Sequence, residues 1–299
     1  MTADAHGKFS GKRLVILGCG YVGTAMARKA RASGLRVIAL TRNEAKAAAL
    51  RAEGVETVVA DLAGDAWHTR IPGEADLVLN CVSSGGGGIE AVRRSYIGGM
   101  ESLLAWARTR GAPGTIVYTG STSVYPQGGG VRVDETAPTA GAGERAQSLL
   151  EAEARLRSGV GAGGRWFILR LAGIYGPGRH RLLDQVRAGQ VAGRGEHQLN
   201  LIHRDDIVAA IWAAFAAAPA VAGGIFNVAD DSAATRAEIA MWLAGRLGVA
   251  VPRFTGEPMP GRTVVTPDRI IANGRIKAQL GWRPAFPGFR EGYENILSR

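Results

Sequence analysis

Cysteine and histidine are scarce in this chain. Only Cys19 and Cys81 occur among its 299 residues, and the five histidines are scattered. A disulfide framework is therefore excluded, and we expect a reducing, cytoplasmic setting. Because histidine and cysteine do not recur at metal-ligand spacing, we expect no metal site.

Long hydrophobic runs are also absent. The most apolar stretch, AAIWAAFAAAPAVAGGIF at 209–226, is interrupted by Pro219 and by Gly223–Gly224. A core helix followed by a turn and a strand accounts for this stretch better than a membrane span does. The N-terminal stretch MTADAHGKFSGK has no apolar run. We therefore expect neither a signal peptide nor a membrane partner.

Acidic residues are in the minority. The 36 Lys and Arg residues outnumber the 26 Asp and Glu residues, which gives a net charge of +10. These basic residues are dispersed, with no basic arm and no zinc-finger spacing, so nucleic acid is not an expected partner. The positive field instead favours small ligands that carry phosphate or carboxylate groups. A small-molecule substrate is therefore the expected partner, and the sequence leaves a homodimer open.

The chain does contain a strand–turn–helix pattern at its start. The sequence predicts strands at 13–18 and 36–40 and helices at 22–33 and 44–54. Such a unit at the beginning of a chain is typical of nucleotide-binding domains.

Three glycines occupy the first strand-to-helix turn in G-x-G-x-x-G spacing. In such a turn the first glycine permits the bend and the second admits a pyrophosphate. The third lets the helix pack closely on the strand. We therefore expect the turn residues to bind a dinucleotide cofactor: Gly18, Gly20, Tyr21, Val22 and Gly23.

The end of the second strand selects the form of the cofactor. An acidic residue there accepts hydrogen bonds from the ribose 2′-hydroxyl of NAD, but this chain has Thr41 followed by Arg42. A hydroxyl beside a guanidinium suits a 2′-phosphate. NADP(H) is therefore favoured, while NAD(H) is retained as the alternative in which Arg42 is only a surface charge.

Further strands are predicted at 57–62, 75–84 and 115–121, with a long helix at 90–109. Alternating strands and helices indicate an α/β fold with a Rossmann-type, doubly wound parallel sheet that binds ligands at the carboxyl ends of its strands. Residues at those ends are therefore expected to line the cofactor: Asp61, Leu62, Cys81, Val82 and Ser83. Cys19 and Cys81 are expected to be neighbours, more readily as two small buried residues than as a redox pair.

The stretch TGSTSVYP at 119–126 gathers hydroxyl groups where a strand ends: Ser121, Thr122, Ser123 and Tyr125. These groups are either catalytic or serve to close a turn. The residues themselves leave both readings open.

Several motifs follow one another in a specific order: GCGYVG (18–23), ADL, TGSTSVYP, DETAP, ILRLAGIYGPGR, NLIHRDDI, GIFNVADD and a C-terminal IIANGRIKAQLGW. Over nearly its whole length the chain thus resembles the NAD(P)-dependent epimerase/dehydratase branch of the extended short-chain dehydrogenase/reductases, in its atypical form. The resemblance implies that Ser121 orients the substrate oxygen and that Tyr125 is the tyrosine of the S-x-x-V-Y motif. It also implies that the loop at Tyr175 lines the nicotinamide.

The chain departs from this family at the helix that carries a Tyr-x-x-x-Lys pair. Its counterpart, TAGAGERAQSLLEAEARL at 139–156, contains neither residue. The tyrosine position falls on Gly143 or Arg145. Arginine cannot donate a proton, although it can hold a carboxylate or phosphate. The remaining candidates for the proton carrier are Tyr96, Tyr125, Tyr175 and His203.

Other residues bear on which substrate the resemblance implies. Leu199 replaces the arginine with which the family commonly grips a diphosphate, which weakens a sugar-nucleotide reading. His203 is a candidate substrate residue, as are Thr122, Ser123, Tyr96 and Arg145, whereas Asp205 and Asp206 are expected to cap a helix at 207–217.

The expected organisation is a dinucleotide-binding domain at 11–171 with a returning strand and helix near 200–229. A smaller substrate lobe is expected at 172–299, with substrate bound between the two. The favoured function is an NADP(H)-dependent oxidoreductase with non-standard catalytic residues that acts on a small, anionic metabolite. The alternatives are an NAD(P)-dependent sugar-nucleotide epimerase or dehydratase and a non-catalytic NADP-sensing or partner-binding protein.

Overall fold

The computed structural model describes residues 9–161, 164–258 and 266–298. The chain divides into two compact units. Unit 1 contains the described residues of Met1–Val124, Ala142–Arg170 and Val208–Phe226, and unit 2 those of Tyr125–Gly141, Leu171–Ile207 and Asn227–Arg299. The segment Tyr125–Gly141 falls in unit 2, although the sequence places it in the dinucleotide-binding part.

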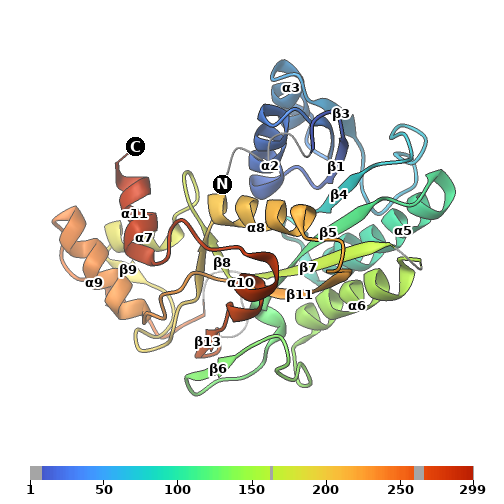
Figure 1. Ribbon diagram of the computed structural model, residues 1–299. Coiled ribbons are helices and arrows are strands. Elements are labelled where there is room, and N and C mark those ends of the chain that lie inside the picture. The colour runs from blue at the N-terminus through green and yellow to red at the C-terminus, as the bar shows by residue number, and fades with distance from the viewer. Residues whose placement is uncertain (1–8, 162–163, 259–265, 299) are drawn as a thin grey trace. The chain divides into compact units, whose positions relative to one another are not determined.

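Unit 1 is built on a seven-stranded sheet with the order β11-β7-β5-β4-β1-β2-β3 (Figure 1). Its strands are β1 (Arg13–Leu17), β2 (Arg36–Thr41), β3 (Glu56–Val59), β4 (Leu77–Asn80), β5 (Thr115–Ser121), β7 (Arg165–Leu171) and β11 (Gly223–Val228). The neighbouring pairs from β3 to β5 are parallel. This topology confirms the predicted Rossmann-type, doubly wound sheet.

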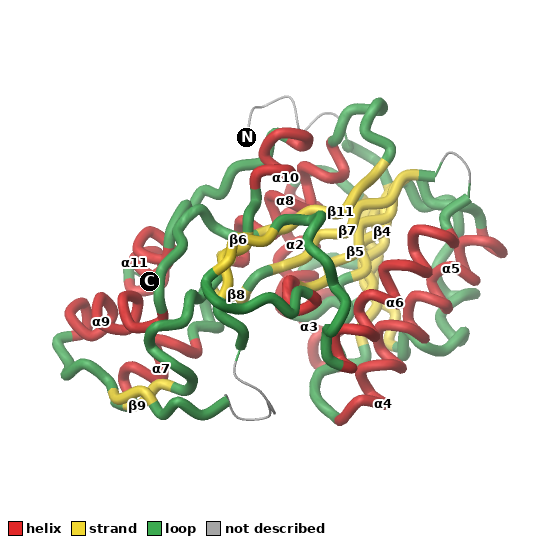
Figure 2. The backbone as a smooth tube through the Cα atoms, turned by 90° about the horizontal axis from the view of Figure 1, so that it is seen from below, coloured by secondary structure: helices red, strands yellow, loops and turns green. Residues whose placement is uncertain are grey.

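Helices cover both faces of this sheet. They are α2 (Tyr21–Ala32), α3 (Glu44–Ala52), α4 (Gly88–Arg93), η1 (Arg94–Gly98), α5 (Gly99–Arg110), η2 (Thr122–Val124), α6 (Glu144–Gly159) and α8 (Arg204–Ala216). Figure 2 shows α5 and α6 on one face and α2 and α8 on the other. Strands covered on both faces read as continuous apolar runs. Accordingly, the side chains from Leu14 to Leu17 are fully buried.

The expected long helix at 90–109 is interrupted by a π-helical turn that the sequence does not predict. Its central residues, Arg94–Gly98, form a π-helical turn between α4 and α5. Such turns are rare and frequently occur at functional sites. The turn contains Tyr96, which is buried.

A buried ion pair links α6 to β7 within unit 1. The Arg170 guanidinium donates from Nε to Glu153 Oε1 at 3.0 Å and from Nη2 to Glu153 Oε2 at 2.6 Å. Gly120 makes room for this pair, because a Cβ there would lie 3.1 Å from Glu153 Oε1. Buried charges persist where a partner satisfies them. Arg170 therefore has a structural role.

Unit 2 is a smaller assembly of short strands and helices. It comprises β6 (Val131–Val133), β8 (Gly173–Tyr175), α7 (Arg181–Arg187), β9 (Gln190–Val191), β10 (Leu201–His203), α9 (Arg236–Leu247), β12 (Arg253–Phe254), β13 (Arg269–Ile271), α10 (Gly274–Leu280) and α11 (Phe289–Leu297). The strands pair in twos, as β10–β8, β12–β9 and β13–β6. Side chains from α7, α9 and α11 form its apolar core.

The acidic residues in the first turn of α8 do not act as expected. The helix begins at Arg204, so Asp205 and Asp206 lie inside its first turn rather than at its cap. The buried Asp206 carboxylate instead accepts the backbone N–H groups of Ala285 at 2.6 Å and Phe286 at 3.1 Å. The expectation that these residues cap a helix at 207–217 is wrong, because the Asp206 carboxylate fastens the segment before α11.

Candidate functional site

The glycine turn between β1 and α2 has no room for side chains at two of its positions. Gly18 has φ +91°, and a Cβ there would lie 2.6 Å from the backbone of Val82. A Cβ on Gly23 would lie 2.7 Å from the Gly18 carbonyl oxygen and 3.0 Å from Cys81 Sγ. Both glycines are therefore required by the packing of the turn against the end of β4.

Gly20 differs from its two neighbours in this turn. A Cβ there would meet no described atom within 4 Å. The space lies at the N-terminus of α2, where Tyr21 and Val22 form the first helical turn and no described side chain caps the helix. An open glycine position at a helix N-terminus fits the close approach of a pyrophosphate.

The thiols of Cys19 and Cys81 lie beside this turn and are in their unreactive, protonated form. Burial raises the pKa of Cys19 to about 11, and burial also raises the pKa of Cys81. Cys81 Sγ donates to the Gly18 carbonyl oxygen at 3.1 Å. Because the thiolate is the reactive form of cysteine, these protonated thiols serve as packing groups.

The end of β2 presents a hydroxyl and a guanidinium. Thr41 is buried, and its hydroxyl accepts the Asn43 N–H at 3.2 Å. Arg42 is exposed and extends toward the glycine loop after β4, since a Cβ on Gly85 would lie 3.4 Å from Arg42 Nη2. No carboxylate occupies the end of this strand.

Asp61 follows β3 and is held in its ionised form. Partial burial would raise its pKa, but the Ala63 N–H and the Arg94 guanidinium hold the pKa below its ordinary value. Arg94 donates to Asp61 Oδ2 at 3.0 Å from Nε. Leu62 is buried under α5, since a Cβ on Gly99 would lie 3.1 Å from Leu62 Cδ2.

The carboxyl end of β4 lies beside β1 and the glycine turn that follows it. The Cys81 N–H donates to Leu17 of β1 at 2.9 Å, and Val82 N–H donates to Asn80 Oδ1 at 3.3 Å. Ser83 is exposed, while Ser84 is buried. The backbone at the carboxyl end of β4 thus lies against the glycine turn, as expected from the pairing of β1 with β4.

The hydroxyls of the stretch TGSTSVYP are divided by the fold. Ser121 Oγ accepts the Ser123 N–H at 3.2 Å and so closes a turn, but its own proton stays available for donation. Thr122 is buried and Ser123 is exposed. Tyr125 is 1% exposed and donates to Asn227 Oδ1 at 2.8 Å. The geometry favours a structural role for Tyr125, whose catalytic role stays a prediction.

Arg145, at the start of α6, reaches two groups of unit 1. Its guanidinium lies 3.4 Å from Ser84 Oγ, 3.4 Å from Tyr96 Oη and 5.9 Å from the centre of the Tyr96 ring. Helix α6 packs against both η1, which carries Tyr96, and η2, which follows Ser121. Arg145 and Tyr96 are thereby brought together beside the carboxyl edge of the sheet.

Two other candidate proton carriers lie in the interior of unit 2. Tyr175 is 3% exposed, and its hydroxyl abuts α11 so closely that a Cβ on Gly292 would lie 1.8 Å away. His203 is fully buried between the rings of Tyr175 and Phe286, and its Nδ1 accepts the Asp205 N–H at 3.3 Å. Their surroundings favour packing roles.

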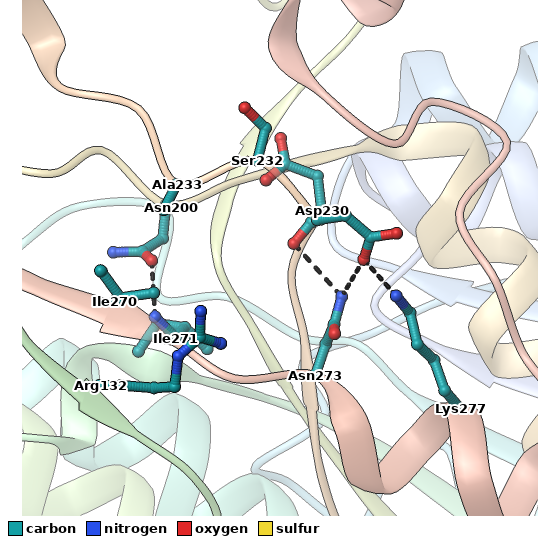
Figure 3. Close-up of a pocket in the computed structure, with 10 residues that line it drawn as sticks. Arg132, Asn200, Asp230, Ser232, Ala233, Ile270, Ile271, Asn273 and Lys277 are labelled. Carbon is teal, nitrogen blue, oxygen red and sulfur yellow. Dashed lines mark hydrogen bonds and ion pairs between the residues drawn. The ribbon is translucent and has the colours of Figure 1, made fainter.

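Unit 2 also contains a polar pocket of about 340 Å³ (Figure 3). It is lined by Arg132, Asn200, Asp230, Asp231, Ser232, Ala233, Ile270, Ile271, Asn273 and Lys277. Most of these residues belong to the motifs NLIHRDDI, GIFNVADD and IIANGRIKAQLGW, which gave no expectation of a pocket. Asp231 pairs with Lys277 and accepts Asn273 Nδ2 at 2.7 Å. Burial raises the pKa of the neighbouring Asp230 to about 8, with the charges of Asp231 and Asp206 adding to the effect.

The sequence profile of the NAD dependent epimerase/dehydratase family matches residues 14–229, and the chain belongs to this family of enzymes. This assignment confirms the resemblance stated from the motifs. No helix in the described ranges is long and apolar enough to cross a membrane.

Three known proteins illustrate the relationship. Protein YeeZ of Escherichia coli (strain K12) is 28% identical over 282 residues, which cover 92% of this chain and 97% of YeeZ. The 3-diazoavenalumate denitrifying reductase of Streptomyces sp is 30% identical over 213 residues, 65% of this chain and 68% of the reductase. UDP-glucuronic acid 4-epimerase from Bacillus cereus, solved in complex with NAD, shares the fold with a TM-score of 0.78 and 16% identity, over 96% of this chain and 99% of that one.

The glycine turn generates a prediction that separates packing from ligand binding. Gly23→Ala should lower the free energy of unfolding by about 1–3 kcal/mol, because its Cβ would meet backbone. Gly20→Ala should lower the free energy of unfolding by less than about 1 kcal/mol, yet weaken the binding of an NAD(P) cofactor at least about tenfold by filling the space for the pyrophosphate. Urea unfolding and calorimetry measure the two effects. Wild-type affinity in Gly20→Ala would contradict the assignment of the turn.

Asp230 generates a prediction about pH. Between about pH 4 and pH 8 its carboxyl is protonated in the folded protein and ionised in the unfolded chain, so folded-state stability falls as pH rises. The fall is about 1.4 kcal/mol per pH unit in that window. Asp230→Asn should therefore be increasingly more stable than wild type from pH 5 to pH 8 in urea unfolding. Asp65→Asn, at an exposed position, is the control, and parallel curves for Asp230→Asn and wild type would refute the prediction.

Proposed function

We propose that the protein is an NADP(H)-dependent oxidoreductase that reduces a carbonyl or imine-like group of a small, anionic metabolite. The observation that carries this proposal is the end of β2, where Thr41 and Arg42 stand in place of a carboxylate. A guanidinium favours a 2′-phosphate, which a carboxylate would repel. The similarity to a relative named as a reductase also supports reduction over epimerisation.

The residues of unit 1 suit the proposed cofactor. Gly20 and the N-terminus of α2 would receive the pyrophosphate, and Arg42 the 2′-phosphate. Asp61 and the residues after β4 would border the adenosine and nicotinamide parts. When bound, the cofactor supplies the hydride, so the protein has to hold the substrate oxygen and deliver a proton to it.

We assign these two tasks to Ser121 and Tyr96. Within the described residues the Ser121 hydroxyl accepts the Ser123 N–H and donates to no acceptor, so its proton can be donated to the substrate oxygen. Tyr96 has its hydroxyl 3.4 Å from Arg145. The permanent charge of Arg145 stabilises the phenolate that remains after Tyr96 gives up its proton. Arg145 thus takes over the electrostatic task of the missing lysine.

The tasks of Ser121 and Tyr96 lead to a kinetic prediction. Tyr96→Phe keeps the ring and removes the hydroxyl, so kcat for NADPH-dependent reduction should fall about 10²–10⁴-fold while NADPH affinity stays unchanged. Ser121→Ala should behave in the same way. Tyr118→Phe is the matched control, because the buried Tyr118 hydroxyl has no hydrogen-bond partner among the described residues.

The measurement is NADPH oxidation against a panel of small anionic carbonyl compounds. Undiminished kcat in Tyr96→Phe would remove Tyr96 from the mechanism. Interconversion of a sugar nucleotide without net NADPH oxidation would instead support an epimerase or dehydratase. Cofactor binding without turnover of any compound would support a sensing role.

A further inference from the structure

Arg236 is a buried arginine that lacks the partner such a residue requires. It is the first residue of α9 and is 6% exposed. Within the described ranges its side chain makes no hydrogen bond or ion pair, and its Nε is completely shielded without an acceptor. Burying a guanidinium without a hydrogen-bond acceptor costs free energy, so the missing acceptor of Arg236 calls for an explanation.

The fold handles another buried arginine quite differently. Arg170 is also buried, but its Nε and Nη2 donate to the two carboxylate oxygens of Glu153. For Arg236 the main effect is burial, which lowers its pKa, and only the Tyr293 oxygen acts in the opposite direction. Outside the described ranges the sequence holds only Asp4 and the C-terminal carboxylate as acidic groups.

The local structure does not need the Arg236 side chain. Its backbone N–H donates to the His197 carbonyl oxygen at 3.0 Å. The helix start is closed by a capping box, in which Thr235 Oγ1 accepts the Glu238 N–H and Glu238 Oε2 accepts the Thr235 N–H. A positive charge in the first turn of a helix is also unfavourable for the helix dipole. Arg236 is therefore retained at a cost to stability.

The side chain of Arg236 lies against a glycine. A Cβ on Gly193 would lie 3.4 Å from Arg236 Nε, so a larger residue there would crowd the guanidinium. The Nε donor is shielded and has no acceptor, whereas the two terminal nitrogens are not among the fully shielded, unpartnered side-chain atoms of the described residues. Those terminal nitrogens are the donors that a bidentate contact to an anion uses. The hydroxyl of Tyr293, on α11, is close enough for its oxygen to act on the charge of Arg236.

We propose that Arg236, with Tyr293 beside it, is an anion-binding site of unit 2 that accepts a carboxylate or phosphate group. A guanidinium matches both anions with two parallel hydrogen bonds. One bound anion would thus neutralise the charge of Arg236 and accept hydrogen bonds from its guanidinium.

Thermal unfolding of the cofactor-free protein tests the site without any activity assay. Inorganic phosphate or acetate, titrated against chloride at constant ionic strength, should raise the Tm of wild type by about 2–4 °C. Arg236→Met should lose this response, while its Tm without added anion should equal or exceed that of wild type. Arg283→Met, which removes an exposed arginine of the same unit, should respond like wild type. Arg236→Gln serves as a second variant if Arg236→Met does not fold.

The outcomes separate the site from the proposed function. The anion that raises Tm identifies the ligand group, and no rise with either anion, or an equal rise in Arg236→Met, would overturn the site. Anion binding without any NADPH-dependent turnover would instead refute the proposed function alone.

Discussion

The arrangement of unit 1 depends on the contact between the glycine turn after β1 and the carboxyl end of β4. Gly18 and Gly23 admit no side chain there, because Val82, Cys81 and the Gly18 carbonyl fill the space. The contact exists because β1 and β4 are neighbours in the sheet, in parallel register. It aligns the start of α2 with the end of β4 and leaves Gly20 facing open space. The proposed pyrophosphate position is thus a consequence of the way the sheet packs.

Buried charges distinguish the structural parts of the molecule from those proposed to bind ligands. Glu153 and Arg170 neutralise each other and fix α6 on the sheet. The anchoring of α6 also positions Arg145 against Tyr96. Arg236 has no such counterpart in the described part of the chain. The fold tolerates the cost of burying this unpaired guanidinium, and in our proposal a bound anion neutralises its charge.

The sequence predicts the sheet of unit 1 well, because long apolar runs and glycine spacing are local signals. The strand at 115–121 has the predicted bounds. The roles of single side chains were less predictable. Tyr125 donates to Asn227, 102 residues away, and Asp206 binds the backbone 79 residues further on. The π-helical turn that carries Tyr96 interrupts a helical segment without a proline, so the sequence predicts one continuous helix there.

The proposed specificity for NADP(H) depends on Arg42, and calorimetric titration of the cofactor-free protein measures this specificity. Wild type should bind NADPH at least about tenfold more tightly than NADH, because only NADPH carries the 2′-phosphate. Arg42→Ala should bind the two cofactors equally, through loss of NADPH affinity alone. Equal affinities in wild type, or an Arg42→Ala variant that still prefers NADPH, would contradict the account.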